Sequence, residues 1–245
     1  MVIFLTFQHQ QATLPSREEH LRTLWRIAKL FEPYGLPVKN WYPPAATRKK
    51  SLAHAAFDQS GPTPAALELL RLHDDKDATT TYRRTGVWSG KEKGRGGSFS
   101  VSFSCDPCNR TSLLYVQFDE VEALDDCRAM QRFMLGLLAI WPVASSIRVG
   151  PLMYYTTHQV FPKRPGAGWM LYLPTAITRE ELPEAAELVP VMEGGTQKGT
   201  IIVSVADATF SIDNPEHLRI ANAIEVRLAD QDVLPRSRGR YVTRE

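Results

Sequence analysis

The sequence predicts an α+β fold, in which a mixed or antiparallel sheet is packed by several helices. The segment 98–104 alternates between apolar residues and serines, a pattern typical of a strand with one buried face. The segment 127–141 instead repeats its apolar residues at helical spacing, as a core helix does. Strands outnumber helices and their connections vary in length, so α+β is favoured over a doubly wound parallel sheet.

The N-terminal part contains one helix with a clear start signal. After a strand expected over 2–7, Ser16 and Glu19 form the capping box of a helix whose apolar face continues to Phe31. The composition of 40–64 then turns to proline, alanine and basic residues, which indicates loop or short irregular elements. We further expect a short helix over 64–72, a polar turn over 73–81 and a surface loop over 86–97.

Beyond residue 98 the chain twice passes through paired strands into a helix with an Asp or Asn cap. Strands over 98–104 and 113–118 flank a hairpin connection, and Asp125 and Asp126 then open the apolar helix that Pro142 ends. The later elements are strands over 147–157, 169–173 and 199–205, a short acidic helix over 180–188, and a last helix capped by Asn214 with Pro215 in its first turn. This order allows two pseudo-repeated strand–strand–helix units.

The length and composition are those of an ordinary globular protein. The 245 residues suffice for a large hydrophobic core, and we expect a single domain over 1–245. It divides into an N-terminal sublobe over 1–95, a C-terminal sublobe over 96–235 and a basic tail over 236–245. Apolar residues make up 43% and charged residues 23%, which excludes the disordered and membrane classes.

Several features of the chain indicate the cytoplasm. No segment approaches the roughly 20 apolar residues that a membrane-spanning helix needs. Residues 1–5 lack the basic start and long apolar run of a signal peptide and read as a strand. Three cysteines are too few for a disulfide framework and favour a reducing compartment. We therefore expect a cytoplasmic protein with no membrane partner.

The charge of the chain disfavours nucleic acid as a partner. The 29 basic and 27 acidic residues leave a net charge of +2, so long-range steering of a polyanion is weak. The basic residues nevertheless cluster over 48–50, 91–95 and 236–244. Such runs are usually solvated loops and chain ends, but they leave open a nucleic-acid-binding module that uses the basic loop and tail.

Tests for catalytic chemistry give little. The sequence has no Walker loop, no G-x-G-x-x-G after a strand and no G-x-S-x-G elbow. Cys105 and Cys108 form a lone C-x-x-C, whereas a structural zinc site needs four ligands. Asp74 and Lys76 match the end of a restriction-type nuclease motif, but no matching acidic residue on a strand precedes them. We expect no enzyme, metal or cofactor, with a metal-dependent nuclease as the alternative.

Three segments within about 147–235 carry a resemblance to a known family. They are Gly168-Trp169-Met170-Leu171-Tyr172-Leu173-Pro174, Gly199-Thr200-Ile201-Ile202-Val203-Ser204, and Asp213-Asn214-Pro215-Glu216-His217 with Ala221-Asn222-Ala223-Ile224-Glu225 and Leu228-Ala229-Asp230. Together they resemble the second half of the immunity protein 52 family of bacterial polymorphic toxin systems. The resemblance implies an α+β cytoplasmic protein that binds and neutralises a cognate toxin. The toxin it implies is a restriction-endonuclease-fold DNase, often delivered by a type VI secretion system. The quoted residues are mostly strand and helix-start residues, which indicates scaffold and not contact surface.

Candidate contact residues follow from the chemistry of such a partner. A nuclease active site faces phosphate, so its rim should be basic and its inhibitor should offer carboxylates. Two clusters do so: Glu120, Glu122, Asp125 and Asp126 form one, and Glu180, Glu181, Glu184 and Glu187 form the other. The competing explanation is that helix-start acids complement the helix dipole. Aromatic, shape-driven contact is the second possibility, through Trp41, Trp88 or Tyr154.

Overall fold

The computed structural model describes residues 1–72, 79–91 and 96–236, which divide into two compact units. The N-terminal unit comprises Phe7–Leu124 and Gly136–Pro142. The C-terminal unit comprises Met1–Thr6, Asp125–Leu135 and the chain from Val143 onward. Helix α4 (Cys127–Ile140) begins in one unit and ends in the other. This division differs from the sublobes expected over 1–95 and 96–235.

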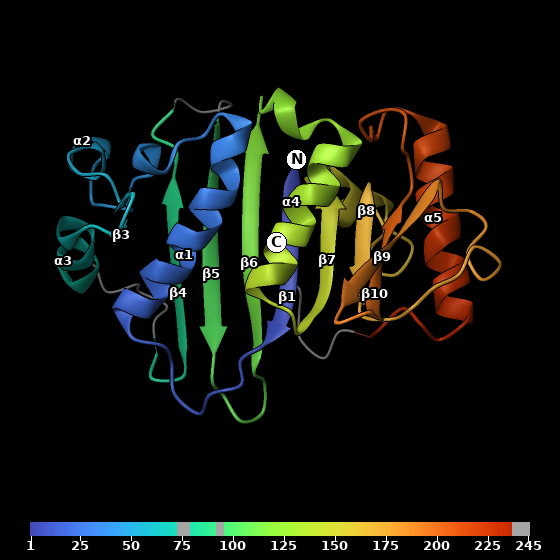
Figure 1. The fold of residues 1–245 in the computed structure, drawn as a ribbon, viewed down its shortest axis with the longest axis horizontal. Coiled ribbons are helices and arrows are strands. Elements are labelled where there is room, and N and C mark those ends of the chain that lie inside the picture. Colours follow the sequence, from blue (N-terminus) through green and yellow to red (C-terminus); the bar gives the residue numbers. More distant parts are fainter. Residues whose placement is uncertain (73–78, 92–95, 237–245) are drawn as a thin grey trace. The chain divides into compact units, whose positions relative to one another are not determined.

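The N-terminal unit is built on three antiparallel strands in the order β4-β5-β6 (Figure 1). Its strands are β4 (Tyr82–Trp88), β5 (Gly96–Ser104) and β6 (Thr111–Asp119), with the short hairpin β2 (Phe57–Asp58) and β3 (Gly61–Pro62). Its helices are α1 (Arg17–Phe31), α2 (Arg48–Leu52) and α3 (Pro64–Leu72), with 3-10 turns at Glu32–Tyr34, Val38–Asn40 and Glu122–Leu124.

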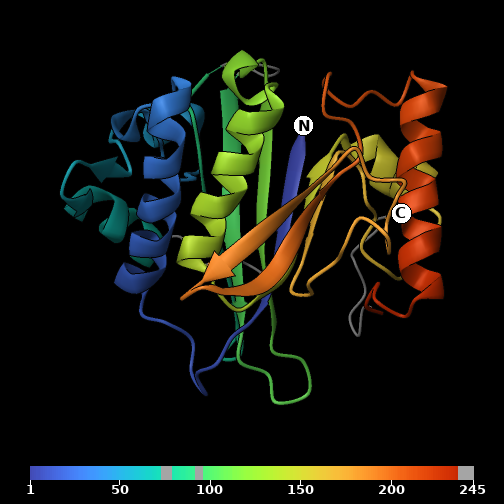
Figure 2. The same cartoon turned by 45° about the vertical axis from the view of Figure 1, so that its right-hand side comes forward.

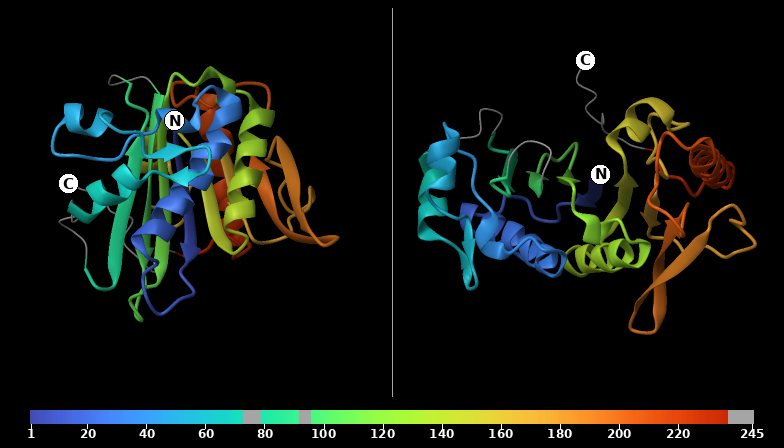
Figure 3. Two further views of the ribbon diagram at one scale, coloured as in Figure 1. Left: turned by 60° about the vertical axis from the view of Figure 1, so that its left-hand side comes forward. Right: turned by 90° about the horizontal axis from the view of Figure 1, so that it is seen from above.

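Helix α1 covers one face of these strands, as Figure 3 shows from above. The predicted capping box is present, since the Ser16 hydroxyl accepts from the Glu19 backbone and the Glu19 carboxylate accepts from the Ser16 backbone. The buried face of α1 ends at Phe31, whose ring stacks on Phe99 of β5 with centroids 5.7 Å apart. Alternation along β5 therefore sends its apolar side chains into this core and its serines to the opposite face.

The C-terminal unit places β1 (Val2–Gln8) beside β7 (Ala144–Gly150), in the order β1-β7-β8-β10-β9. The remaining elements are β8 (Met170–Leu173), β9 (Glu187–Glu193), β10 (Thr196–Val203), a π-helical turn (Tyr154–His158) and α5 (Pro215–Asp230). Figure 2 shows β9 and β10 as a long twisted hairpin, with α5 as a separate helix. Asn214 caps α5 through its side chain and Pro215 occupies the first turn, as predicted.

Eight antiparallel strands with several packed helices confirm the predicted α+β class. The hairpin between β5 and β6 and the core helix that follows Asp126 are also confirmed. Among the described residues, no helix is long and apolar enough to cross a membrane.

Three predicted elements were wrong. The expected helix over 180–188 is a series of turns that leads into β9, because Pro183 interrupts it and Val189 and Val191 favour a strand paired to β10. The expected strand over 147–157 stops at Gly150 and is followed by the π-helical turn.

The loop expected over 86–97 is the third. Its first residues end β4 and Gly96 begins β5, while 92–95 lie outside the described residues. The turn expected over 73–81 lies mostly outside them as well, and with it Asp74 and Lys76.

Candidate protein-binding surface

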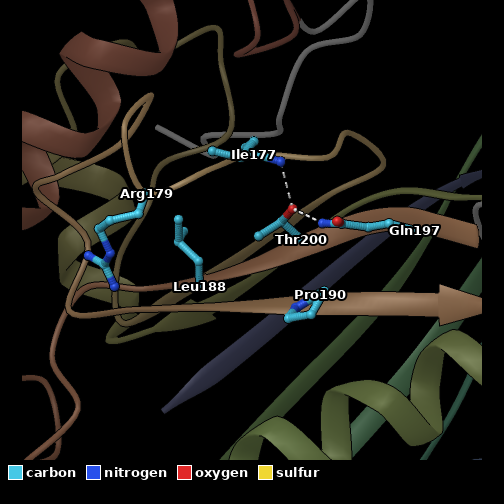
Figure 4. Close-up of a pocket in the computed structure, with 6 residues that line it drawn as sticks. All are labelled: Ile177, Arg179, Leu188, Pro190, Gln197 and Thr200. Carbon is cyan, nitrogen blue, oxygen red and sulfur yellow. Dashed lines mark hydrogen bonds between the residues drawn. The ribbon is translucent and has the colours of Figure 1, made fainter.

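A shallow pocket of about 280 Å³ lies beside the β9–β10 hairpin (Figure 4). Its lining residues are Ile177, Arg179, Leu188, Pro190, Gln197 and Thr200. The Thr200 hydroxyl donates to the Thr175 carbonyl and accepts from the Ile177 amide, at 2.9 and 3.0 Å. Arg179 donates to the carbonyls of Ala185 and Ala186. These hydrogen bonds hold the loop before β9 in place. The polar groups of the pocket are therefore used to anchor the loop and do not converge on a ligand.

The acidic cluster Glu180–Glu187 is largely engaged within the C-terminal unit. Glu184 accepts two hydrogen bonds from the Arg227 guanidinium on α5, which hold the pKa of this carboxyl below its ordinary value. Glu187 accepts from Gln131 on α4 at 2.8 Å. Glu181 accepts from the Thr178 backbone at the turn. Glu180 is exposed. These partners favour a structural role for Glu181, Glu184 and Glu187.

The other acidic cluster divides between the two units. Glu120 and Glu122 belong to the N-terminal unit and are exposed, with Glu120 at a positive φ of 54°. Asp125 and Asp126 belong to the C-terminal unit. The Asp126 carboxylate accepts from the Ala129 backbone at 2.7 Å, as a helix cap does. The helix-start explanation therefore holds for Asp126.

The structure places the three aromatic candidates very differently. Trp41 and Tyr154 are fully buried, with exposures of 1% and 0%, so neither is the exposed anchor that the sequence suggested. Trp41 lies against Phe99 with ring centroids 4.6 Å apart, inside the N-terminal core. Trp88 is half-buried at the end of β4, where its indole N–H donates to the Ser51 hydroxyl. Of the three, only Trp88 borders a surface.

That surface is the side of β4, β5 and β6 that faces away from α1, which we call the open face. Its members point away from α1: Tyr82, Arg84, Trp88, Ser98, Ser100, Ser102, Leu113, Tyr115 and Gln117. The strand register sets Ser100 between Gly86 and Tyr115, and Ser102 between Arg84 and Leu113. A row of small hydroxyl side chains thus runs between two rows of larger ones.

Hydrogen bonds hold the larger side chains over the serines. The Arg84 Nε donates to the Ser100 hydroxyl at 3.1 Å, and the Tyr82 hydroxyl donates to that of Ser102 at 3.2 Å. Burial raises the pKa of the Tyr115 phenol, and the nearby Arg84 cation opposes this shift. Arg84 itself is exposed. The open face therefore presents a cation and aromatic rings in fixed positions.

Several of the residues that carry the family resemblance are buried and make hydrogen bonds within the C-terminal unit. Gly168 has a φ of +53° and allows the backbone to pass close to Tyr155. The Trp169 indole donates to the Val205 carbonyl at 2.9 Å, and the Ser204 hydroxyl donates to the Gly168 carbonyl at 2.7 Å. Glu225 is fully buried and accepts from the backbone of Ala167 at 2.9 Å.

Comparisons with known proteins support the fold and little more. No protein-family model matches the sequence, and a search of curated proteins gives no match either. The structure is similar to a solved structure, the Pseudomonas aeruginosa T6SS protein PA0821. The TM-score is 0.50 and the identity 14%, over 91% of this chain and 72% of that one. At this identity the likeness shows a shared fold.

The described residues contain no group of three or more His, Cys, Asp or Glu side chains that could hold a metal ion. His20 is buried beside Arg83, and its Nε2–H donates to the Val101 carbonyl at 3.0 Å. Burial first, and the Arg83 cation second, lower the pKa of His20 to about 3. His20 is thus a neutral core residue at neutral pH. The open face is the candidate site that the described residues offer.

Proposed function

We propose that this protein is an immunity protein associated with a type VI secretion system, which binds and neutralises a cognate toxin in the cytoplasm. The open face of the N-terminal unit is the observation that carries the proposal. The resemblance to the immunity protein 52 family and the fold shared with a Pseudomonas aeruginosa T6SS protein support it. The resemblance further suggests a restriction-endonuclease-fold DNase as the toxin.

The composition of the open face suits protein recognition. Binding surfaces of antibodies are rich in tyrosine and serine, with tryptophan and arginine as the strongest anchors. Tyrosine supplies a large, rigid contact area, and serine adapts its hydroxyl to donors or acceptors. Arg84 is exposed and flanked by Tyr82 and Tyr115, so a partner carboxylate could meet it in a planar, bidentate geometry. Because the sheet fixes these side chains, little conformational entropy is lost on binding.

On this proposal protection needs binding alone and no catalysis by the immunity protein. Inhibition then works by covering the toxin or by preventing its assembly. A slightly basic chain is compatible with this, because neutralisation does not require a DNA-like acidic surface.

The test is coexpression with a candidate toxin in a susceptible bacterium; if a neighbouring gene encodes a secreted nuclease-like protein, that protein is the first candidate. The protein should restore growth, and the two purified proteins should form a complex. Cell death despite expression of folded protein, with no complex, would refute the function. Incubating the protein alone with plasmid DNA and Mg²⁺ tests the nuclease alternative, because only an enzyme would nick the plasmid.

A nucleic-acid partner remains the second candidate, because aromatic rings beside an arginine on a sheet also stack on unpaired bases. Its binding would weaken steeply with added salt, as counterion release requires. Salt-sensitive binding to single-stranded nucleic acid, lost in Arg84→Ala, would favour this candidate over toxin binding.

A further inference from the structure

A second exposed surface lies on the C-terminal unit, over residues 152–164. Leu152, Met153 and Val160 expose 44%, 52% and 38% of their surface, which is unusual for large apolar side chains. Between them runs the π-helical turn Tyr154–His158. Such turns are rare in proteins and occur frequently at functional sites. We call the three apolar side chains with Lys163 and Arg164 the 152–164 patch.

Two buried tyrosines occupy the inner side of the turn. Tyr154 and Tyr155 point inward, and the Tyr154 hydroxyl donates to the Glu225 carboxylate of α5. Tyr155 packs edge-on against Phe4 of β1. Leu152 and Met153, which precede them, are left facing solvent. Figure 3 shows β7 between α4 and this turn, so the turn forms an outer layer of the unit.

The far end of the patch is held by the same buried carboxylate. Glu225 accepts hydrogen bonds from the backbone amides of Val160 and Ala167, at 2.8 and 2.9 Å. The Arg164 guanidinium donates to the Leu234 carbonyl and lies over the Phe161 ring. The patch is therefore fixed at both ends before any partner arrives, which lowers the entropic cost of binding.

The exposed charge within the patch is positive. From Cys127 to Arg179 the sequence contains no aspartate or glutamate. Lys163 is exposed within the patch, and Arg164 and His158 are half-buried beside it. Exposed apolar side chains beside the Lys163 ammonium complement a surface that combines apolar side chains with carboxylates.

We propose that the 152–164 patch docks an acidic, apolar segment of the toxin. This inference rests on the proposed function and adds a second contact surface. From the sequence we expected carboxylates of the inhibitor to meet a basic rim of the toxin, whereas this patch is apolar and basic. A membrane surface fits less well, because the aromatic residues that anchor proteins at lipid interfaces are turned inward here. Nucleic acid fits less well, because Leu152 and Met153 offer neither charge nor a ring for stacking.

The experiment measures affinity for the purified toxin by titration calorimetry. The variants are Leu152→Ser with Met153→Ser, and Lys163→Glu alone. Met192→Ser, which alters a methionine exposed to 56% on β9, is the matched apolar control. Arg132→Glu, an exposed residue of α4 within the same acid-free stretch, is the matched charge control. Both patch variants should bind at least about tenfold more weakly than the parent, and both controls should bind as the parent does.

The outcomes separate this inference from the proposed function. If the parent binds the toxin and protects cells while both patch variants bind equally tightly, only the patch inference fails. If the parent itself neither binds nor protects, the function fails. Thermal unfolding of each variant identifies loss of fold, and Lys163→Glu, on an exposed side chain, keeps the test valid if the serine variant unfolds. Sedimentation of the parent with phosphatidylglycerol vesicles, lost in the patch variants, would overturn the inference in favour of a membrane.

Discussion

The Tyr154 hydroxyl donates a hydrogen bond to the Glu225 carboxylate, and both side chains are fully buried. Burial raises the pKa of Glu225, and the hydrogen bonds from Tyr154 and from the amides of Ala167 and Val160 oppose this shift. Burial and the nearby carboxylate also raise the pKa of Tyr154. The pair joins α5 to the segment that precedes β8. The position of that segment therefore depends on the Glu225 carboxyl group.

Glu225→Gln should therefore change how stability depends on pH. Because the pKa of Glu225 is higher in the folded than in the unfolded chain, the native state binds more protons above the ordinary pKa of 4.5. The parent thus loses stability as pH rises from 4.5 through the folded pKa, with a slope of up to about 1.4 kcal/mol per pH unit. The Gln variant lacks this loss. Urea unfolding of both proteins from pH 4 to 8 measures the difference, and a difference that stays constant with pH would contradict the prediction.

Gly168→Ala should destabilise the C-terminal unit. The backbone there has a φ of +53°, and an added Cβ would lie 2.5 Å from the Tyr155 hydroxyl and 2.8 Å from the Val149 carbonyl. Strain and overpacking together should cost on the order of 2–4 kcal/mol in the free energy of unfolding. Gly194→Ala also requires a positive φ but meets no atom within 4 Å, so it serves as the control for steric contact. Equal losses in thermal unfolding would mean that contact with Tyr155 has no part in the effect.

Arg84→Ala should weaken toxin binding without changing the fold. Arg84 is exposed on the open face, and its loss removes a cation at a position typical of interface anchors. A loss of about 2 kcal/mol would raise the dissociation constant roughly 30-fold. Arg26→Ala alters an exposed arginine on α1 of the same unit and should have no effect. Unchanged affinity in Arg84→Ala combined with Tyr115→Ser would exclude the open face as the contact surface.

The acidic clusters give the competing prediction. Glu187→Lys should lower the melting temperature, because Glu187 accepts from Gln131 and lies 3.5 Å from the Arg128 guanidinium. Glu180→Lys should not, because Glu180 is exposed in a turn. If reversing Glu120 and Glu122 to Lys together with Glu180→Lys leaves toxin affinity intact, docking through carboxylates is wrong. A marked loss of affinity at an unchanged melting temperature would instead support it.

Local signals predicted the helix ends well. The capping box of Ser16 and Glu19 and the cap at Asn214 each depend on residues close in sequence, and both are present. Strand β9 was missed because its acidic start resembles a helix, and only pairing with β10 decides otherwise. That pairing is a contact between chain segments, which a pattern of single residues does not contain.

The open face was missed for a related reason. The serine alternation of β5 was visible, but its meaning depends on the register that sets Arg84 and Tyr115 on either side. The alternation of Tyr82, Arg84 and Trp88 was the signal that could have revealed the neighbouring strand. Trp41 and Tyr154 were candidates because aromatic side chains are typical interface anchors when they are exposed. Their burial comes from packing against Phe99 and Glu225, far away in the sequence.

The division of the chain has a consequence for how the protein is made. Residues 1–6 belong to the C-terminal unit, where the Ser145 hydroxyl donates to the Thr6 carbonyl across 139 positions of sequence. A ribosome that adds about 5–20 residues per second needs roughly 10–30 s to cover that distance. During this interval the first strand has been synthesised and its partner β7 has not. A nascent chain stalled before β7 would therefore leave the edge of β1 that pairs with β7 without its partner strand.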